Sequence, residues 1–252
     1  MTATSAPETY PETYYAGAYW GARRESPEDC AQRTAHFLGL LAACDPFLAH
    51  WHKPAKTRKD ARQLALMPPD VLTLAELFRH GVTREPGGPA LEELGFRCSF
   101  DNGGASGDCA TMRINGGVYS DAVPNHCVLS VPWRGPNADR LLTVSVLLNV
   151  VRATVLSWDP DWAVAMSTAY ERRFREPHSA PFALGWITYL SNRLGRVPPL
   201  PAPVHIEPVE DRGTLIVLTS QRFTAANPEH VALARRVREL MTGAGLMPPI
   251  AP

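Results

Sequence analysis

Three short runs between residues 96 and 131 alternate apolar and polar side chains, and this pattern strongly restricts how the chain can fold. The runs cover residues 96–100, 110–114 and 127–131, and glycine-rich segments at 102–104 and 115–117 separate them. A period of two is typical of a β-strand with one buried face, and short glycine turns join neighbouring antiparallel strands. The pattern therefore predicts an antiparallel meander.

Further strands are expected on both sides of this meander. The aromatic segment 14–20 predicts the first strand, and residues 162–166 and 185–190 are also rich in β-forming side chains. Residues 204–209 and 214–218 bracket a polar turn and predict a hairpin. The sequence thus predicts strands along most of its length.

Helix start and stop signals mark the segments between the strands. Ser26 is a favourable N-cap, Pro27 suits the first helical position, and Asp45 with Pro46 ends the apolar pattern that follows. A final helix is expected from the N-cap Asn227 to about Gly243 or Gly245. Shorter helices are predicted over 71–80, over 90–94 and around Tyr170, whereas the basic residues between 47 and 70 predict an irregular loop.

The most apolar stretch of the chain lies between Leu141 and Trp158. Asn137 is the expected N-cap of one long helix over this stretch, and Asp159 with Pro160 ends it. Several polar residues interrupt the stretch, whereas a membrane span needs about 20 largely uninterrupted apolar residues. We therefore expect a long helix buried in the core.

These elements predict one α+β domain, in which a largely antiparallel sheet packs against several helices. Residues 1–12 are polar and rich in proline, so we expect a flexible N-terminal segment followed by a single domain over 13–252. The proline-rich connector at 198–203 is a possible boundary. The tail beyond it holds only two strands and one helix, which is too little to bury a core of its own.

Composition excludes some classes of partner. Lysine and arginine total 25 and aspartate and glutamate also total 25, so the chain has no general attraction for nucleic acid or for an anionic membrane. The five cysteines are widely spaced and contain no C-x-x-C pair, which favours free thiols in a reducing compartment. The N-terminus has no pattern of a secretory signal, and we expect a cytoplasmic protein.

Candidate catalytic groups are few. His50 and His52 could face the same side of a strand and bind a metal, but no third ligand lies at a recognised spacing. His126 and Cys127 are adjacent, so on a strand they would point to opposite faces and could not act as a base and nucleophile pair. Phosphate-binding and nucleophile-elbow motifs are also missing from the sequence, so we predict no catalytic residues, no metal site and no cofactor.

Several blocks of sequence together resemble the immunity protein 52 family of bacterial polymorphic-toxin and type VI secretion systems. They are Tyr-Tyr-Ala-Gly-Ala-Tyr-Trp-Gly at 14–21, Pro-Asp-Trp at 160–162, Gly-Trp-Ile-Thr-Tyr-Leu-Ser at 185–191, and the stretch 198–245, which includes Gly-Thr-Leu-Ile-Val at 213–217 and Arg-Phe-Thr-Ala-Ala-Asn-Pro-Glu at 222–229. The resemblance implies a cytoplasmic antidote that binds a cognate toxin, a nuclease of the restriction-endonuclease fold, and occludes its active site or its assembly surface. It implies no catalytic residues.

An inhibitor of a nuclease often presents carboxylates where the enzyme expects phosphate. The best local acidic groups lie in the predicted hairpin and beside two tryptophans near residue 160. The candidate toxin-binding residues are therefore Asp159, Asp161, Trp162, Glu207, Glu210 and Asp211. Most of the six tryptophans should be buried, and one or two exposed ones would fit a binding face.

Two other functions remain open from the sequence. One is a small thiol or metal-dependent hydrolase that uses Cys127, His126 or the pair His50 and His52. The other is a secretion-system adaptor, which would bind a secretion component without inhibiting a toxin. Bound metal or a convergent polar pocket would favour the hydrolase.

Overall fold

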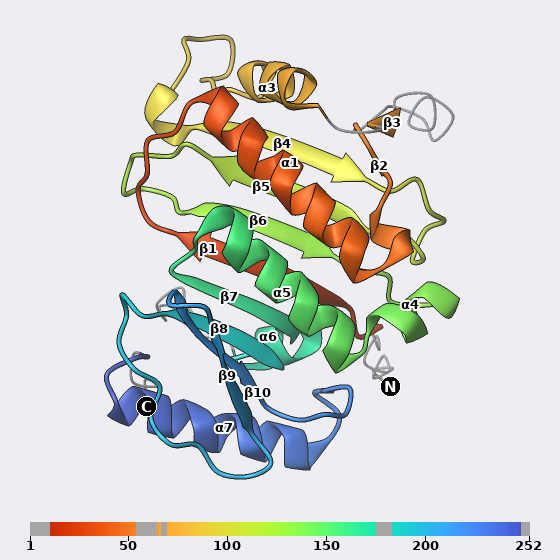
Figure 1. Ribbon diagram of the computed structural model, residues 1–252, viewed down its shortest axis with the longest axis vertical. Coiled ribbons are helices and arrows are strands. Elements are labelled where there is room, and N and C mark those ends of the chain that lie inside the picture. Colours follow the sequence, from red (N-terminus) through yellow and green to blue (C-terminus); the bar gives the residue numbers. More distant parts are fainter. Residues whose placement is uncertain (1–10, 54–64, 67–69, 175–182, 248–252) are drawn as a thin grey trace, which may run out of the picture.

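One antiparallel sheet forms the centre of the molecule, in a computed structural model that describes residues 11–53, 65–66, 70–174 and 183–247. Its ten strands lie in the order β3-β2-β4-β5-β6-β1-β7-β8-β10-β9, and all the neighbouring pairs are antiparallel (Figure 1). The strands are β1 (Tyr14–Trp20), β2 (Trp51–His52), β3 (Ala65–Leu66), β4 (Phe96–Asp101), β5 (Thr111–Gly116), β6 (Asn125–Ser130), β7 (Trp162–Ser167), β8 (Ile187–Ser191), β9 (His205–Val209) and β10 (Gly213–Val217). The predicted meander is confirmed, because β4, β5 and β6 are consecutive neighbours.

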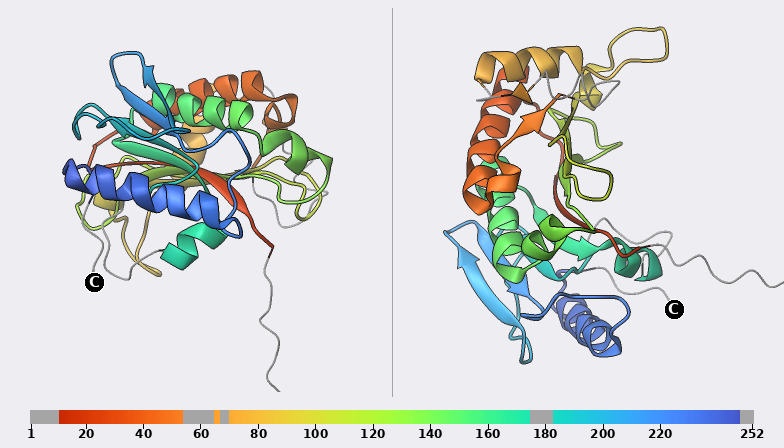
Figure 2. Two further views of the ribbon diagram at one scale, coloured as in Figure 1. Left: turned by 90° about the horizontal axis from the view of Figure 1, so that it is seen from below. Right: turned by 90° about the vertical axis from the view of Figure 1, so that its right-hand side faces the viewer.

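Helices cover the two faces of the sheet unequally. The α-helices are α1 (Pro27–Cys44), α3 (Val71–His80), α4 (Pro136–Leu141), α5 (Val144–Trp158), α6 (Thr168–Phe174) and α7 (Pro228–Gly243). Two short 3-10 helices are η1 (Pro46–Leu48) and η2 (Glu92–Leu94). Helices α1 and α5 lie side by side across one face of the sheet, and α6 and α7 lie on the opposite face (Figure 2). The predicted α+β class is confirmed.

The start of α1 follows from its sequence. The Ser26 hydroxyl accepts a hydrogen bond from the Asp29 backbone N–H at 3.1 Å, and the Asp29 carboxylate accepts one from the Ser26 N–H at 2.9 Å. This reciprocal capping box satisfies two backbone donors that the helix itself leaves unpaired. The hydrogen bonds from Ser26 stabilise the charged carboxylate and therefore lower the pKa of Asp29.

The core lies between the sheet and the pair α1 and α5. Phe37 and Leu41 of α1 are fully buried, as are Val150 and Trp158 of α5. The Trp158 ring stacks on that of Trp20 in β1, with centroids 5.2 Å apart. Because aromatic stacking adds to area burial, this contact fixes α5 against the centre of the sheet.

The predicted single helix from Asn137 to Trp158 is wrong in its first part. Two helices occupy the segment, and Leu142 between them has a non-helical ψ of 53°. The N-cap of α5 is Thr143, whose hydroxyl accepts a hydrogen bond from the Val146 N–H. Thr143 competes with Asn137 as a capping residue, and the Asn137 side chain instead donates to the Asp108 carboxylate at 3.0 Å.

Two other local predictions need correction. The segment 47–70, expected to be an irregular loop, contains η1 and the two-residue strands β2 and β3 at the edge of the sheet, while 54–64 and 67–69 lie outside the described residues. The helix expected over 90–94 is the single 3-10 turn η2, because Gly95 with a φ of 65° ends it. Neither correction changes the fold class.

The segment beyond the proline-rich connector is part of the same sheet. Strand β10 pairs with β8 from Gly213↔Ser191 to Val217↔Ile187, and β9 pairs with β10 as the predicted hairpin. Helix α7 begins after its N-cap Asn227, as predicted, and buries Val231, Ala234 and Val237. Among the described residues, no helix combines the length and the apolar character that a membrane span requires.

Candidate functional site

The junction between α5 and β7 is a sharp corner made by three residues. Helix α5 ends at Trp158, and Asp159 adopts a left-handed conformation with φ 45° and ψ 59°. Pro160 follows, and the Asp161 N–H then donates to the Tyr19 carbonyl oxygen at 3.0 Å, which starts the pairing of β7 with β1. A left-handed aspartate is uncommon, and such residues persist where surrounding contacts hold them in place.

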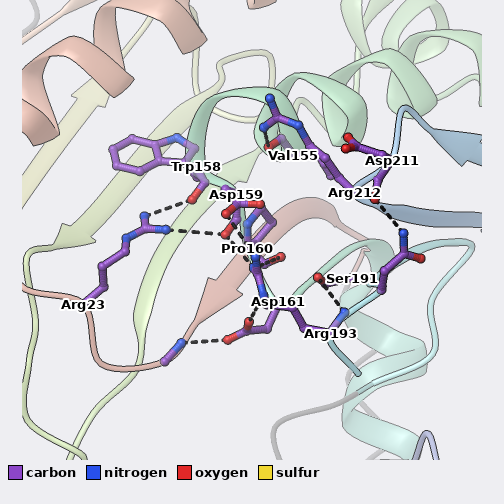
Figure 3. Close-up of polar contacts among 12 residues, drawn as sticks. Arg23, Val155, Trp158, Asp159, Pro160, Asp161, Ser191, Arg193, Asp211 and Arg212 are labelled. Atoms are coloured by element: carbon purple, nitrogen blue, oxygen red, sulfur yellow. Dashed lines mark hydrogen bonds and ion pairs between the residues drawn. The ribbon is translucent and has the colours of Figure 1, made fainter. Parts of the chain in front are cut away.

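Arg193, just after β8, holds this corner together (Figure 3). Its Nη1 donates to Asp159 Oδ2 at 3.1 Å and its Nε donates to Asp161 Oδ1 at 3.3 Å. Its Nη2 donates to the backbone carbonyl oxygens of Asp159 at 3.1 Å and Pro160 at 3.3 Å. The other carboxylate oxygen of Asp161 accepts from the Gly21 N–H at 2.9 Å, so both aspartates are bound within the fold.

The tip of the β9–β10 hairpin reaches the same corner. Asn192 donates to the Asp211 backbone carbonyl oxygen at 2.7 Å (Figure 3). Arg212 forms an ion pair with Glu210 at 3.1 Å. Glu210 has a φ of 49°, and among the described residues only it and Asp159 are non-glycine residues with a positive φ. We call Asp159, Asp161, Arg193, Glu210, Asp211 and Arg212 the acid–arginine corner.

Arginines from distant segments cap the end of α5 at this corner. The last turn of α5 has no basic residue of its own. Arg23 donates to the Trp158 carbonyl oxygen at 2.9 Å, and Arg212 donates to those of Val155 and Leu156 at 3.4 Å (Figure 3). Cations at a helix C-terminus satisfy unpaired carbonyl groups and interact favourably with the helix dipole. These arginines therefore contribute to stability as well as to surface charge.

Arg23 is itself partly buried, and desolvation lowers the pKa of its guanidinium group. The Glu25 carboxylate acts in the opposite direction, since its Oε1 lies 3.2 Å from Arg23 Nε. The same oxygen pairs with Arg33 of α1, and the Glu25 side chain is only 6% exposed. These ion pairs hold Arg23 in position at the C-terminal end of α5.

The structure brings together four of the six residues that the sequence singles out. Asp159, Asp161, Glu210 and Asp211 share the acid–arginine corner, with side-chain exposures of 39%, 32% and 58% for the first three. Glu207 lies on β9 and pairs with Arg152 of α5 instead. The contribution of arginine to this site was missed, because no sequence spacing connects residues 23, 193 and 212 with residue 159.

Trp162 is placed differently from an exposed interface anchor. Its side chain is 5% exposed, and its ring stacks on Tyr19 with centroids 4.4 Å apart and an interplanar angle of 14°. A buried stacked indole contributes mainly to packing between β1 and β7. Five of the six tryptophans are buried, as the composition predicts, and Trp133 is the partly exposed one.

The residues considered for hydrolysis do not converge. Cys127 is fully buried on the sheet face that α1 and α5 cover, and desolvation raises the pKa of its thiol. His126 points to the opposite face, towards Tyr19, as their adjacency on a strand predicts. His52 belongs to β2 but His50 precedes the strand, and the described residues contain no group of three or more metal-binding side chains. All five cysteines are free thiols, as predicted.

Comparison with known proteins gives a fold relative and a family. The structure resembles that of the Pseudomonas aeruginosa T6SS protein PA0821, with a TM-score of 0.53 and 14% sequence identity, over 95% of this chain and 76% of that one. At this identity the likeness shows a shared fold. No curated protein matches the chain. The family model described as immunity protein 52 matches residues 12–250, which is nearly the whole sequence, and the chain therefore belongs to the immunity protein 52 family.

Proposed function

We propose that this chain binds a cognate bacterial toxin in the cytoplasm and neutralises it by occluding its active site or an assembly surface. The observation that carries the proposal is the match of the immunity protein 52 model to residues 12–250. The match includes every described strand and helix, so the full domain is what the family has in common with this chain. The resemblance to a T6SS protein fits the same setting.

We further propose that the toxin is a nuclease of the restriction-endonuclease fold. This rests on the resemblance described above, which associates the family with that class of toxin. An inhibitor of such an enzyme needs a rigid complementary surface, because a rigid surface loses little conformational entropy on binding. The continuous sheet with its buried aromatic contacts provides a rigid scaffold of this kind.

The acid–arginine corner is our first candidate for a toxin contact. Its aspartates and Glu210 are paired with arginines, and Asp211 is exposed at the tip of the hairpin. Paired carboxylates at fixed positions can exchange hydrogen bonds with a partner with little reorganisation. The left-handed backbone at Asp159 and Glu210 also fits a functional position, since strained residues cluster at such sites.

Co-expression with the toxin encoded beside it tests the proposal. We expect survival of cells that express both proteins, and a stable stoichiometric complex after purification. Loss of protection, with no complex between the purified proteins, would remove the immunity function. Protection without a complex would also contradict it, because the mechanism is inhibition by binding.

Two matched variants separate inhibition by binding from hydrolysis. Cys127→Ala and His50→Gln remove the thiol and one of the imidazoles that a hydrolase would use. We expect both variants to protect cells as well as the wild-type protein does, provided that their folded fractions are similar. A folded variant that binds the toxin but no longer protects would favour an enzymatic role.

A further inference from the structure

Half of the sheet face opposite α1 and α5 is open. On the half near α7, the side chains of this face are buried, and Val164, Met166 and Ile216 are at most 1% exposed. On β4 and β5 the corresponding side chains of Arg97, Ser99 and Arg113 are exposed. Among the described residues no helix lies behind β4, β5 and β6 (Figure 2).

Two arginines are neighbours on this open face, towards the end of the sheet at which β4 begins. Arg97 is paired across the strands with Asn115, and Ser99 is paired with Arg113. The two arginines are therefore diagonal neighbours on one face, a spacing at which long side chains can interact. His126 lies opposite Asn115 on the next strand, so the basic groups of three strands are grouped together.

In the part of the chain that the structure describes, no ion pair neutralises the charge of these arginines. Neither Arg97 nor Arg113 forms an ion pair with any residue that the structure describes, whereas Arg152, Arg193 and Arg212 all do. The nearby acid on the same strands is Asp101, whose Oδ1 accepts a hydrogen bond from the Gly103 N–H at 2.8 Å. Like charges side by side on a sheet are destabilising, and an anionic partner would relieve this cost.

A hollow of about 380 Å³ lies at the other end of the open face. The residues that line it include Tyr15, Thr111, Ser130, Trp133 and Glu171. Trp133 is the tryptophan that the core does not bury, and the Arg134 guanidinium carbon lies 4.9 Å from the centroid of its ring. Tyrosine, tryptophan and arginine are the residue types that most often anchor protein interfaces.

We propose that the open face of β4, β5 and β6 is the main surface on which the cognate toxin docks, and that the acid–arginine corner is a contact at its rim. The toxin presents carboxylates to Arg97 and Arg113 and inserts a side chain into the hollow beside Trp133. This inference rests on the proposed function and adds which surface of the chain binds and what charge the partner carries. Complementary charges of this kind fix the register of a complex and speed its formation.

A protein partner fits this face better than a nucleic acid does. Nucleic-acid binding draws most of its affinity from several simultaneous phosphate contacts. The whole chain is neutral, with 25 basic and 25 acidic residues, and the open face offers two unpaired arginines on its strands. An acidic protein surface requires only a few matched charges around an apolar contact.

The test compares charge-reversed variants of the full-length protein for binding to a catalytically inactive form of the toxin. We expect R97E/R113E to bind about 100-fold more weakly than wild type, since close charge pairs at interfaces have large coupling energies. R97K/R113K keeps both charges and should bind close to wild type. R196E/R236E changes the net charge equally at two exposed positions away from the strands and should also bind close to wild type.

Calorimetry at low and high salt, with a thermal melt of each variant, completes the experiment. Screening by about 0.5 M salt should reduce the difference between wild type and R97E/R113E. If R97E/R113E is unstable, the milder R97Q/R113Q variant should show a smaller loss in the same direction. Equal affinity of wild type and folded R97E/R113E overturns the inference and leaves the proposed function standing. Absence of binding by the wild-type protein overturns both.

Discussion

Arg193 donates to both the carboxylate and the backbone carbonyl oxygen of Asp159, at 3.1 Å in each case. The two contacts hold the side chain and the main chain of a left-handed residue at once. They also join the end of α5 to the end of β8, which are far apart in the sequence. Arg193 is therefore a structural clamp for the corner.

Replacing Arg193 with alanine should destabilise the protein. The change removes hydrogen bonds to Asp159, Asp161 and Pro160, and we expect a loss of about 1–2 kcal/mol in the free energy of unfolding. The effect stays modest because the side chain is 52% exposed. Urea unfolding measures it, with Arg196→Ala as a control at an exposed position. Equal stability of the two variants would show that the contacts of Arg193 contribute nothing to the free energy of unfolding.

The variant Glu210→Gly should be more stable to unfolding than the variant Glu210→Ala. Its φ of 49° is unfavourable for any residue with a Cβ atom by about 1 kcal/mol, and glycine has no such penalty. Both variants lose the exposed ion pair with Arg212, so their difference isolates the backbone conformation. We expect Glu210→Gly to exceed Glu210→Ala by about 1 kcal/mol in urea unfolding. The opposite order would mean that the hairpin tip is not left-handed.

The strands were predictable from the sequence because their signal is local. Alternating side chains at 96–100 and at 127–131 are enough to identify β4 and β6, and the capping residues Ser26 and Asn227 identify the starts of two helices. The break before Thr143 was missed because apolar residues continue on both sides of it, with two leucines before it and valines after it. Tertiary packing decides which of two plausible caps is used.

The candidate site was only partly predictable. Asp159 and Asp161 were identified as one acidic group, and Glu210 and Asp211 as another, but their common location depends on the order of β8, β10 and β9. The arginines around them, Arg23, Arg193 and Arg212, come from three separate segments. Contacts between residues so far apart in the sequence produce no periodic residue pattern, so a single sequence does not reveal them.

Among the tryptophans near α5, replacement of Trp158 by alanine should cause the largest loss of stability. It is fully buried and stacked on Trp20, so Trp158→Ala should cost about 3–5 kcal/mol of unfolding free energy. Trp133→Ala is the matched control, because that side chain is partly exposed and its loss should cost much less. Denaturant titration of both variants checks the order. Similar losses would contradict the position of Trp158 in the core.

His126 should make the stability of the protein depend on pH. Burial, with smaller contributions from Arg97 and Arg113, lowers the pKa of His126 below its ordinary value of 6.5. Below pH 6.5 the unfolded chain therefore binds a proton more readily than the folded chain, and stability falls until the pH reaches the folded pKa. Above pH 6.5 the imidazole is neutral in both states and this loss is absent.

His126→Gln removes the titrating group and should flatten this part of the profile. Urea unfolding of wild type and His126→Gln across pH 5–8 checks it, with His205→Gln at an exposed position as a control. We expect the two stability curves to diverge below pH 6.5 with wild type falling faster, which is the direction that a lowered pKa requires. Parallel curves for wild type and His126→Gln would exclude His126 as the source of the dependence.

Charge reversal at the hairpin tip tests the acid–arginine corner as a toxin contact. Glu210 and Asp211 are exposed at the tip, so E210K/D211K should weaken toxin binding while the fold stays intact. We expect a loss of about tenfold or less, mainly in the association rate, because exposed charges at an interface rim act chiefly through steering. The matched control D121K/E239K makes the same change in net charge at two other exposed positions. Protection in cells and association rates that are equal for both variants would exclude the tip as a contact, and a loss larger than that of R97E/R113E would place the main docking surface at the corner.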